Sequence, residues 1–134
     1  MTEQLISRDV LREITSNNRI RLFRNQMGEY ELKDGRHIRS GLCPGSSDFV
    51  GWTTITVTKE MVGKKLAVFT AMEFKMPAAL KYITNNYNEL KMYNGDDKKK
   101  KRLGQQINFI ERVRMAGGKA GFVSNIKEGW SVVE

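Results

Sequence analysis

Three charged residues in two short segments are of the types that hold a divalent cation beside a phosphodiester. Asp48 follows a proline-glycine turn, and Glu73-Phe74-Lys75 ends an apolar run. Side chains alternate across a strand, so Glu73 and Lys75 are expected to share one face. We predict that strands at 48–57 and 66–75 form a hairpin that brings Asp48 near Glu73. Two carboxylates with an ammonium beside them predict a metal-dependent phosphodiesterase.

The cation that suits this set is Mg²⁺ or Mn²⁺. Magnesium prefers oxygen ligands in near-octahedral geometry and keeps several waters. We therefore predict Asp48, Glu73 and the backbone carbonyl of Phe74 as ligands, with Lys75 positioning the attacking water. The alternative is structural, because an aspartate in a turn is commonplace and an exposed Glu-x-Lys pair contributes little.

Length and composition predict one domain over residues 1–134 with a single layered core. No apolar run approaches the roughly 18 residues of a membrane span, so we expect no membrane association and an intracellular location. One cysteine and one histidine exclude an internal disulfide and a Cys/His zinc cluster. We interpret His37 as a surface or loop residue and Cys43 as a bystander.

The chain is strongly basic, with a net charge of +8 and a pI of about 9.7. A polyanion such as nucleic acid would explain this charge, although a merely soluble basic protein is the alternative. The densest basic run is Lys98, Lys99, Lys100, Lys101 and Arg102. We predict a mobile loop or the frayed start of a helix there, acting either as a DNA-gripping arm or as an ordinary solvated loop.

Periodicity and turn residues predict an α/β fold with a central mixed sheet and flanking helices. Parallel pairing is expected for the last strand, because it follows a crossover helix. The expected elements of the first half are a helix capped by Ser7 and ended by 16–18, and an extended pattern at 19–24 that continues over 27–32 as one strand entering a loop or short hairpin at the turn 34–35. They are followed by strands at 48–57 and 66–75, helices at 78–93 and around 103–113, a C-cap at Gly117-Gly118, a strand at 119–124, and a terminal helical turn capped by Asn125.

Four ordered motifs resemble the virus-type replication-repair nuclease (VRR-NUC) domain, a branch of the PD-(D/E)XK nuclease superfamily. Arg12-Glu13-Ile14 and Arg24-Asn25-x-x-Gly28 also fit that pattern, and the resemblance runs from about Leu11 to Ser124. The four motifs are Pro44-Gly45-x-x-Asp48-Phe49-x-Gly51, Glu73-x-Lys75, Gln106-x-x-Phe109-Ile110 and Gly117-Gly118-x-Ala120.

The resemblance implies a restriction-endonuclease-like core of order α-β-β-β-α-β with an inserted helix or loop. It implies that Asp48 and Glu73 bind the metal, that Lys75 is catalytic, and that Gln106 completes the site. Glu13 would add an acid and a metal ligand from the first helix. The alternatives are an exposed helix acid at Glu13 and, with the register shifted by one, Gln105 in place of Gln106. Nucleic-acid contacts are expected from Arg24, Asn25 and residues 98–102.

The expected activity is therefore a Mg²⁺- or Mn²⁺-dependent DNA endonuclease. The compact stand-alone members that this chain resembles look viral, and they imply a homodimer that cuts branched DNA such as four-way (Holliday) junctions. One departure from the family pattern is the long segment 76–105 between Glu73-x-Lys75 and Gln106. The rival interpretations are a DNA-binding protein that does not cut and a basic accessory protein of a replication machine.

Overall fold

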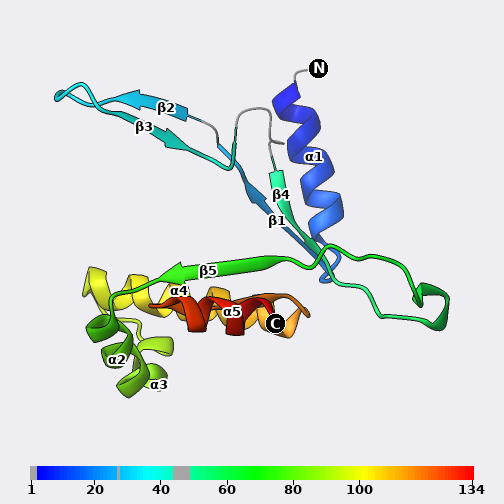
Figure 1. The fold of residues 1–134 in the computed structure, drawn as a ribbon. Helices are drawn as coiled ribbons and strands as arrows, with labels where there is room; N and C mark the ends of the chain where they lie inside the picture. Colours follow the sequence, from blue (N-terminus) through cyan, green and yellow to red (C-terminus); the bar gives the residue numbers. More distant parts are fainter. Residues whose placement is uncertain (1–2, 27, 44–48) are drawn as a thin grey trace. The chain divides into compact units, whose positions relative to one another are not determined.

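The computed structural model describes residues 3–26, 28–43 and 49–134. The chain divides into two compact units, Met1–Val57 and Thr58–Glu134, and each is described by itself. The first unit contains α1 (Glu3–Thr15), β1 (Ile20–Arg24), β2 (Gly28–Glu31), β3 (His37–Ser40) and β4 (Phe49–Thr53). The second contains the 3-10 turn η1 (Lys59–Met61), β5 (Thr70–Phe74), α2 (Pro77–Asn85), α3 (Tyr87–Lys91), α4 (Lys98–Met115), β6 (Lys119–Val123) and α5 (Ile126–Val133) (Figure 1).

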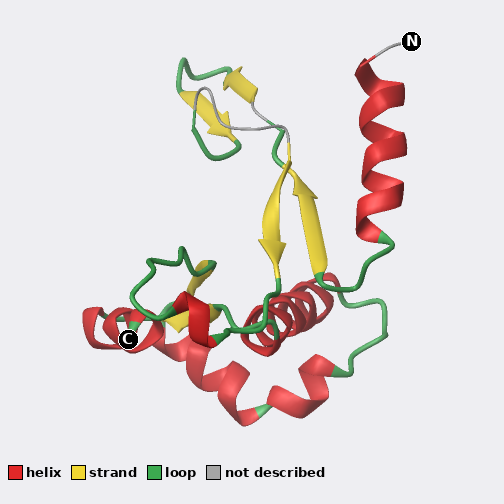
Figure 2. Cartoon of the chain, turned by 90° about the vertical axis from the view of Figure 1, so that its right-hand side faces the viewer, coloured by secondary structure: helices red, strands yellow, loops and turns green. Residues whose placement is uncertain are grey.

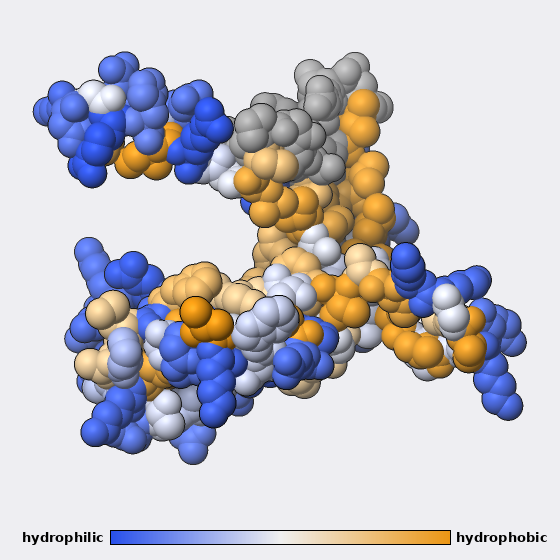
Figure 3. Space-filling view, viewed as in Figure 1, coloured by the Kyte–Doolittle hydropathy of each residue, from blue (hydrophilic) through white to orange (hydrophobic). Residues whose placement is uncertain are grey.

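Two antiparallel strand pairs make up the sheets of the first unit. β1 pairs with β4 so that Leu22 lies opposite Gly51, and β2 pairs with β3 around the predicted turn at Asp34 and Gly35. Gly35 has a φ of +86°, a conformation that glycine adopts without steric cost. The side chains of this hairpin are mostly hydrophilic and exposed (Figure 3). The single extended strand expected over 19–32 is thus divided into β1 and β2, which pair with different partners, while the turn at Asp34 and Gly35 is confirmed.

Two predictions about the first part of the chain are wrong. Helix α1 begins at Glu3, so Ser7 lies inside the helix instead of at its N-cap, because residues 3–6 before it also have helical backbone. The expected hairpin of strands 48–57 and 66–75 does not form in the described residues, since β4 pairs with β1 and β5 pairs with β6. Helix α1 does end where the polar residues 16–18 begin.

The second unit is mostly helical and is built around one parallel strand pair, β5 and β6 (Figure 2). Glu73 lies opposite Phe122, and backbone bonds extend the ladder from Phe69 to Lys75. Parallel strands need a crossover connection, and α2, α3 and α4 provide it. The parallel pairing predicted for the last strand is confirmed.

A small apolar core joins the crossover helices to each other. Ile83 of α2, Leu90 of α3, and Leu103 and Ile107 of α4 are buried together. Tyr87 and Phe122 pack against this cluster with their side chains partly buried. The long segment 76–105 therefore supplies three of the four buried residues of this cluster.

Strand β5 is shorter and more exposed than expected. The sequence predicted a strand from Leu66 to Lys75 buried on both faces, whereas β5 covers Thr70–Phe74 and has only partly buried residues at its centre. A strand with a single paired neighbour cannot be covered like the central strand of a larger sheet. In the same way, the described strands form three two-stranded sheets, so the structure is mixed α/β without one central sheet among the described residues.

The predicted helix over 78–93 is divided into α2 and α3 at Asn86. The backbone of Asn86 leaves the helical region, with φ −122° and ψ 25°, and its side chain donates to the Tyr82 carbonyl at 2.8 Å. An asparagine side chain that bonds to a nearby carbonyl competes with the helix. Pro77 begins α2 after β5 has ended, in the first-turn position that proline tolerates.

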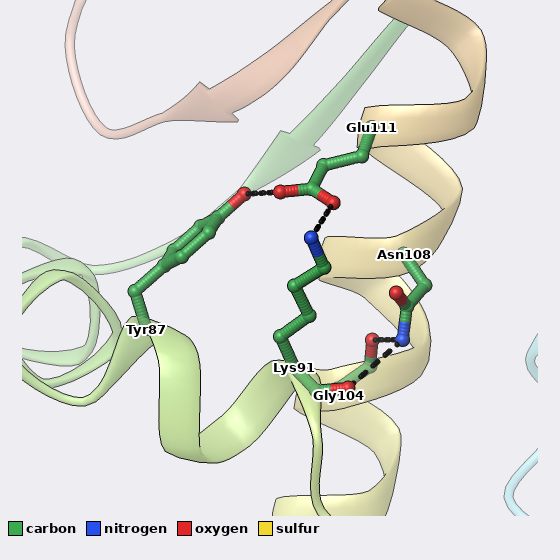
Figure 4. Close-up of polar contacts among 5 residues, drawn as sticks. All are labelled: Tyr87, Lys91, Gly104, Asn108 and Glu111. Atoms are coloured by element: carbon green, nitrogen blue, oxygen red, sulfur yellow. Dashed lines mark hydrogen bonds and ion pairs between the residues drawn. The ribbon is translucent and has the colours of Figure 1, made fainter. Parts of the chain in front are cut away.

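A hydrogen-bonded network fixes α3 on α4 (Figure 4). The Tyr87 hydroxyl donates to Glu111 Oε1 at 2.7 Å, and Lys91 Nζ lies 2.6 Å from Glu111 Oε2. Asn108 Nδ2 donates to the carbonyls of Lys91 and Gly104. Burial, followed by the bond to Glu111, raises the pKa of Tyr87 to about 12. The Lys91 ammonium, followed by Tyr87, lowers the pKa of Glu111.

Helix α4 has a cap at each end. Asp97 accepts a hydrogen bond from the backbone N–H of Lys100 at 3.0 Å, which makes it the N-cap. Gly117 follows the helix with a φ of +93°, as the sequence predicted for the C-terminal stop. The basic run 98–102 thus belongs to the first turns of α4, which favours the helical alternative over the loop.

Asn125 caps α5, as predicted, because its side chain accepts from the Glu128 N–H at 2.9 Å. The Glu128 carboxylate in turn accepts hydrogen bonds from the Ser124 hydroxyl and from the side-chain amide of Asn125. No helix among the described residues combines the length and the apolar composition that crossing a membrane requires.

Replacing Gly104 by alanine is expected to lower the free energy of unfolding by about 1–3 kcal/mol, because the added methyl group would overlap the carbonyl oxygen of Leu90. Gly129→Ala is the matched control: its Cβ would lie 3.8 Å from Val123 Cγ1, so it should be neutral or stabilising by up to about 1 kcal/mol. Urea denaturation measures both. Equal stability of the two variants would contradict the tight contact of α3 with α4.

Tyr87 should ionise near pH 12, above the ordinary tyrosine pKa of about 10. A raised folded-state pKa contributes stability that is present below the ordinary value of about 10 and is lost as the pH rises through about 12. Titration of tyrosinate absorbance should show a late step that Tyr87→Phe removes. Tyr30→Phe, at an exposed tyrosine, is the control variant and should leave the late step in place. A late step that survives in Tyr87→Phe would contradict the network.

Candidate functional site

Three of the predicted site residues come together in the second unit. Glu73 lies near the end of β5, and Lys75 is the second residue after it, on the same side of the extended chain. Lys75 Nζ lies 3.8 Å from Glu73 Oε1. The lysine side chain is only 18% exposed, whereas the glutamate side chain is 40% exposed. The ammonium is therefore held in a fixed place while the carboxylate is open to solvent.

Gln106 reaches this pair from α4. Its Nε2 donates to Glu73 Oε1 at 2.9 Å, across 33 positions of sequence. Gln106 lies three residues after Leu103 and four before Ile110, which are both buried, so it borders the inner face of α4, whereas Gln105 is exposed. The contact favours Gln106 over Gln105. The chemical roles of Glu73, Lys75 and Gln106 stay predictions.

The amide oxygen of Gln106 is in an unusual environment. Gln106 Oε1 is buried and has no hydrogen-bond donor within the described part of the chain. The bond to Glu73 sets its orientation, because turning the amide would place two acceptor oxygens against each other. A buried acceptor without a partner costs about 1–3 kcal/mol. Such an atom is a ready acceptor for a water or a cation beside Glu73.

These oxygens fit a hard divalent cation in part. The Glu73 carboxylate and the Gln106 amide oxygen are ligands of the kind that Mg²⁺ and Mn²⁺ prefer, and Lys75 beside them suits an anionic substrate. In the three described ranges, no group of three or more His, Cys, Asp or Glu side chains gathers where it could hold a metal ion. The remaining ligands would be waters, phosphate oxygens and the second predicted acid.

That second acid, Asp48, lies outside the described residues. Glu13 belongs to the first unit, where it is exposed on α1 and its carbonyl accepts from the Ser16 hydroxyl at 2.6 Å. Arg24 is exposed at the end of β1. Asn25 is buried, and its Oδ1 accepts from the backbone N–H of Leu42 at 2.9 Å, so the side chain holds the segment after β3.

His37 and Cys43 are both exposed, in accordance with their interpretation as residues outside the chemistry. His37 lies on β3, 3.8 Å from a Glu29 oxygen, and not in a loop.

Sequence reasoning did not identify a hollow of about 440 Å³ beside the C-terminal helix. Its lining includes Arg114, Lys119, Phe122 and Glu128, and does not include Glu73, Lys75 or Gln106. Arg114 donates to the Ala120 carbonyl at 2.7 Å, and Lys119 donates to that of Val133. These cations are thus tied to the backbone, and this hollow is separate from the candidate site. No pattern in the sequence predicts this hollow.

No family model, no curated protein and no solved structure matches this chain. The resemblance to the nuclease family rests on the motifs alone.

Gln106→Leu is expected to keep or raise the free energy of unfolding, by about 1 kcal/mol, because it removes a buried acceptor that has no partner. Asn108→Leu, on the same helix, is the matched control and should lose about 1–2 kcal/mol with its two hydrogen bonds. Urea denaturation compares them. If both variants lose the same stability, the Gln106 amide is structural and not reserved for a ligand.

Proposed function

We propose that this protein is a Mg²⁺- or Mn²⁺-dependent DNA endonuclease. It hydrolyses phosphodiester bonds in branched DNA such as four-way junctions, and it acts as a homodimer whose two sites face two strands. The proposal includes a restriction-endonuclease-like core in which β5 and α4 carry the active site, and DNA contacts from Arg24, Asn25 and the basic run of α4.

The observation that carries the proposal is the cluster of Glu73, Lys75 and Gln106, in which the buried Oε1 of Gln106 has no hydrogen-bond donor. An ion pair kept only for stability needs no buried acceptor beside it, because a partnerless polar atom destabilises the fold. Polar atoms that cost stability are retained where they bind something. Carboxylate, amide oxygen and ammonium together match a cation and a phosphate.

The charge distribution supports a polyanionic substrate. Residues 58–134 contain 15 Lys and Arg against 8 Asp and Glu, so the second unit has a formal charge of +7 out of the total of +8. The unit that contains Glu73, Lys75 and Gln106 is therefore also the unit that attracts phosphates.

Hydrolysis proceeds by attack of a water oxygen on phosphorus. The attacking water gives up its proton to solvent, and the sugar oxygen leaves with its bonding electrons and takes up a proton from solvent. Glu73 would hold the cation through its carboxylate, and Gln106 orients Glu73 through the bond to Oε1. A bound Mg²⁺ supplies Lewis-acid polarisation of the phosphate and a lower pKa of the water. Lys75 positions the water and offsets the negative charge that grows on the phosphate oxygens.

The direct test is cleavage of a labelled four-way DNA junction in Mn²⁺, beside linear, nicked and flap DNA. Wild type is expected to cut the junction, and Glu73→Ala and Lys75→Ala should each slow cutting by at least about a hundredfold, as losses of electrostatic stabilisation do. Lys81→Ala, at an exposed lysine of α2, is the matched control and should cut like wild type.

Equal cutting by wild type, Glu73→Ala and Lys75→Ala would overturn the assignment of the site. Binding of the junction without any cutting would favour a DNA-binding protein that does not cut. Association with DNA that is weak and indifferent to salt would favour a basic accessory protein, since phosphate contacts make affinity fall with salt.

A further inference from the structure

The basic run 98–102 is wound into the first turns of α4, so its five cations point in different directions. An α-helix turns by about 100° per residue. Lys99 and Arg102 precede Gln106 by seven and four positions, which places them about 20° and 40° from Gln106 around the axis. Lys99, Arg102 and Gln106 therefore form one stripe along the helix.

The other three cations of the run lie off this stripe. Lys98 is rotated by about 80° from Gln106, and Lys101 by about 140°. Lys100 is directed to Tyr93, whose ring centroid lies 5.7 Å from its Nζ. A cation over an aromatic ring is already stabilised there.

Lys99 and Arg102 are exposed, and no carboxylate within the described residues forms an ion pair with either of them. The first turn of α4 contains no acid. Cations at the N-terminal end of a helix are unfavourable, because the helix dipole is positive there. Lys99 and Arg102 thus have no partner carboxylate, and they lie on the same side of α4 as Gln106, which contacts Glu73.

We propose that Lys99 and Arg102, rather than the run as a whole, bind the backbone phosphates of the DNA strand that enters the Glu73–Lys75–Gln106 site. This inference rests on the proposed nuclease function and deepens it by naming the residues that place the strand. Lys99 and Arg102 are positioning residues that contact phosphates away from the scissile bond.

The spacing along the helix suits successive phosphates. With a rise of about 1.5 Å per residue, Arg102 and Lys99 lie about 6 Å and 10 Å from Gln106 along the axis. Nucleotides of one strand are about 3.4 Å apart along a duplex, so the stripe covers about two to three nucleotide steps. β5 runs toward the N-terminal end of α4, so the stripe extends beyond the end of the strand that carries Glu73 (Figure 1).

The experiment compares two double variants that remove the same charge from the same helical turns. Lys99→Ala/Arg102→Ala removes the stripe, and Lys98→Ala/Lys101→Ala removes two cations off it. Binding of a labelled four-way DNA junction is measured without divalent cations over a series of salt concentrations. Wild-type cleavage in Mn²⁺ is measured separately.

The stripe variant is expected to bind at least about tenfold more weakly, with a salt slope smaller by about two, because each lost phosphate contact removes about one unit. The control should keep a slope close to that of wild type. Circular dichroism verifies that both variants fold.

Equal losses in the two variants would overturn the stripe and leave a general basic face. Loss of slope in the stripe variant alone, with no cutting by wild type in Mn²⁺, would support the stripe and overturn the nuclease. Cutting by wild type with unchanged binding by the stripe variant would overturn the stripe and leave the nuclease standing.

Discussion

The parallel pairing of β5 with β6 is the constraint on which the second unit depends. Two parallel neighbours cannot be joined by a tight turn, so the chain must leave one end of the sheet and return to the other. The return leg is α4, which runs back along the strands and places Gln106 against Glu73. A contact between residues far apart in sequence thus follows from strand direction, and the candidate site exists because of it.

The contact between Gln106 and Glu73 is only partly favourable for stability. Gln106 satisfies one oxygen of Glu73 but leaves its own carbonyl oxygen buried without a partner. The Tyr87–Glu111–Lys91 network, less than two turns further along α4, satisfies its polar atoms fully by comparison. The same helix therefore has one polar cluster that holds α3 in place and another that retains an unused acceptor. The difference between them marks the site more clearly than charge does.

Sequence predicted the elements that local chemistry decides. The caps at Asn125 and Gly117 and the turn at Asp34–Gly35 follow from residue types that act within a few positions. The parallel pairing of the last strand followed instead from the helices that precede it. Strand partners were wrong for β4, because any strand with an apolar face can pair with several others, and only packing selects one. The motif resemblance implied that Gln106 lies beside Glu73, and helical spacing indicated only that it is on or near the buried face. Its partnerless oxygen could be found only in three dimensions.

The long connection between Lys75 and Gln106 departs from the motif pattern of the nuclease family described above, yet it has a structural role. Ile83 and Leu90 within it are each 1% exposed, and Ile107 of α4 is packed against them. Deleting α2 and α3 from this connection would remove the apolar side chains that pack against the inner face of α4. Because Gln106 lies on the same helix, losing these neighbours would also disturb its position beside Glu73. Packing of this crossover and the geometry of the candidate site are therefore coupled.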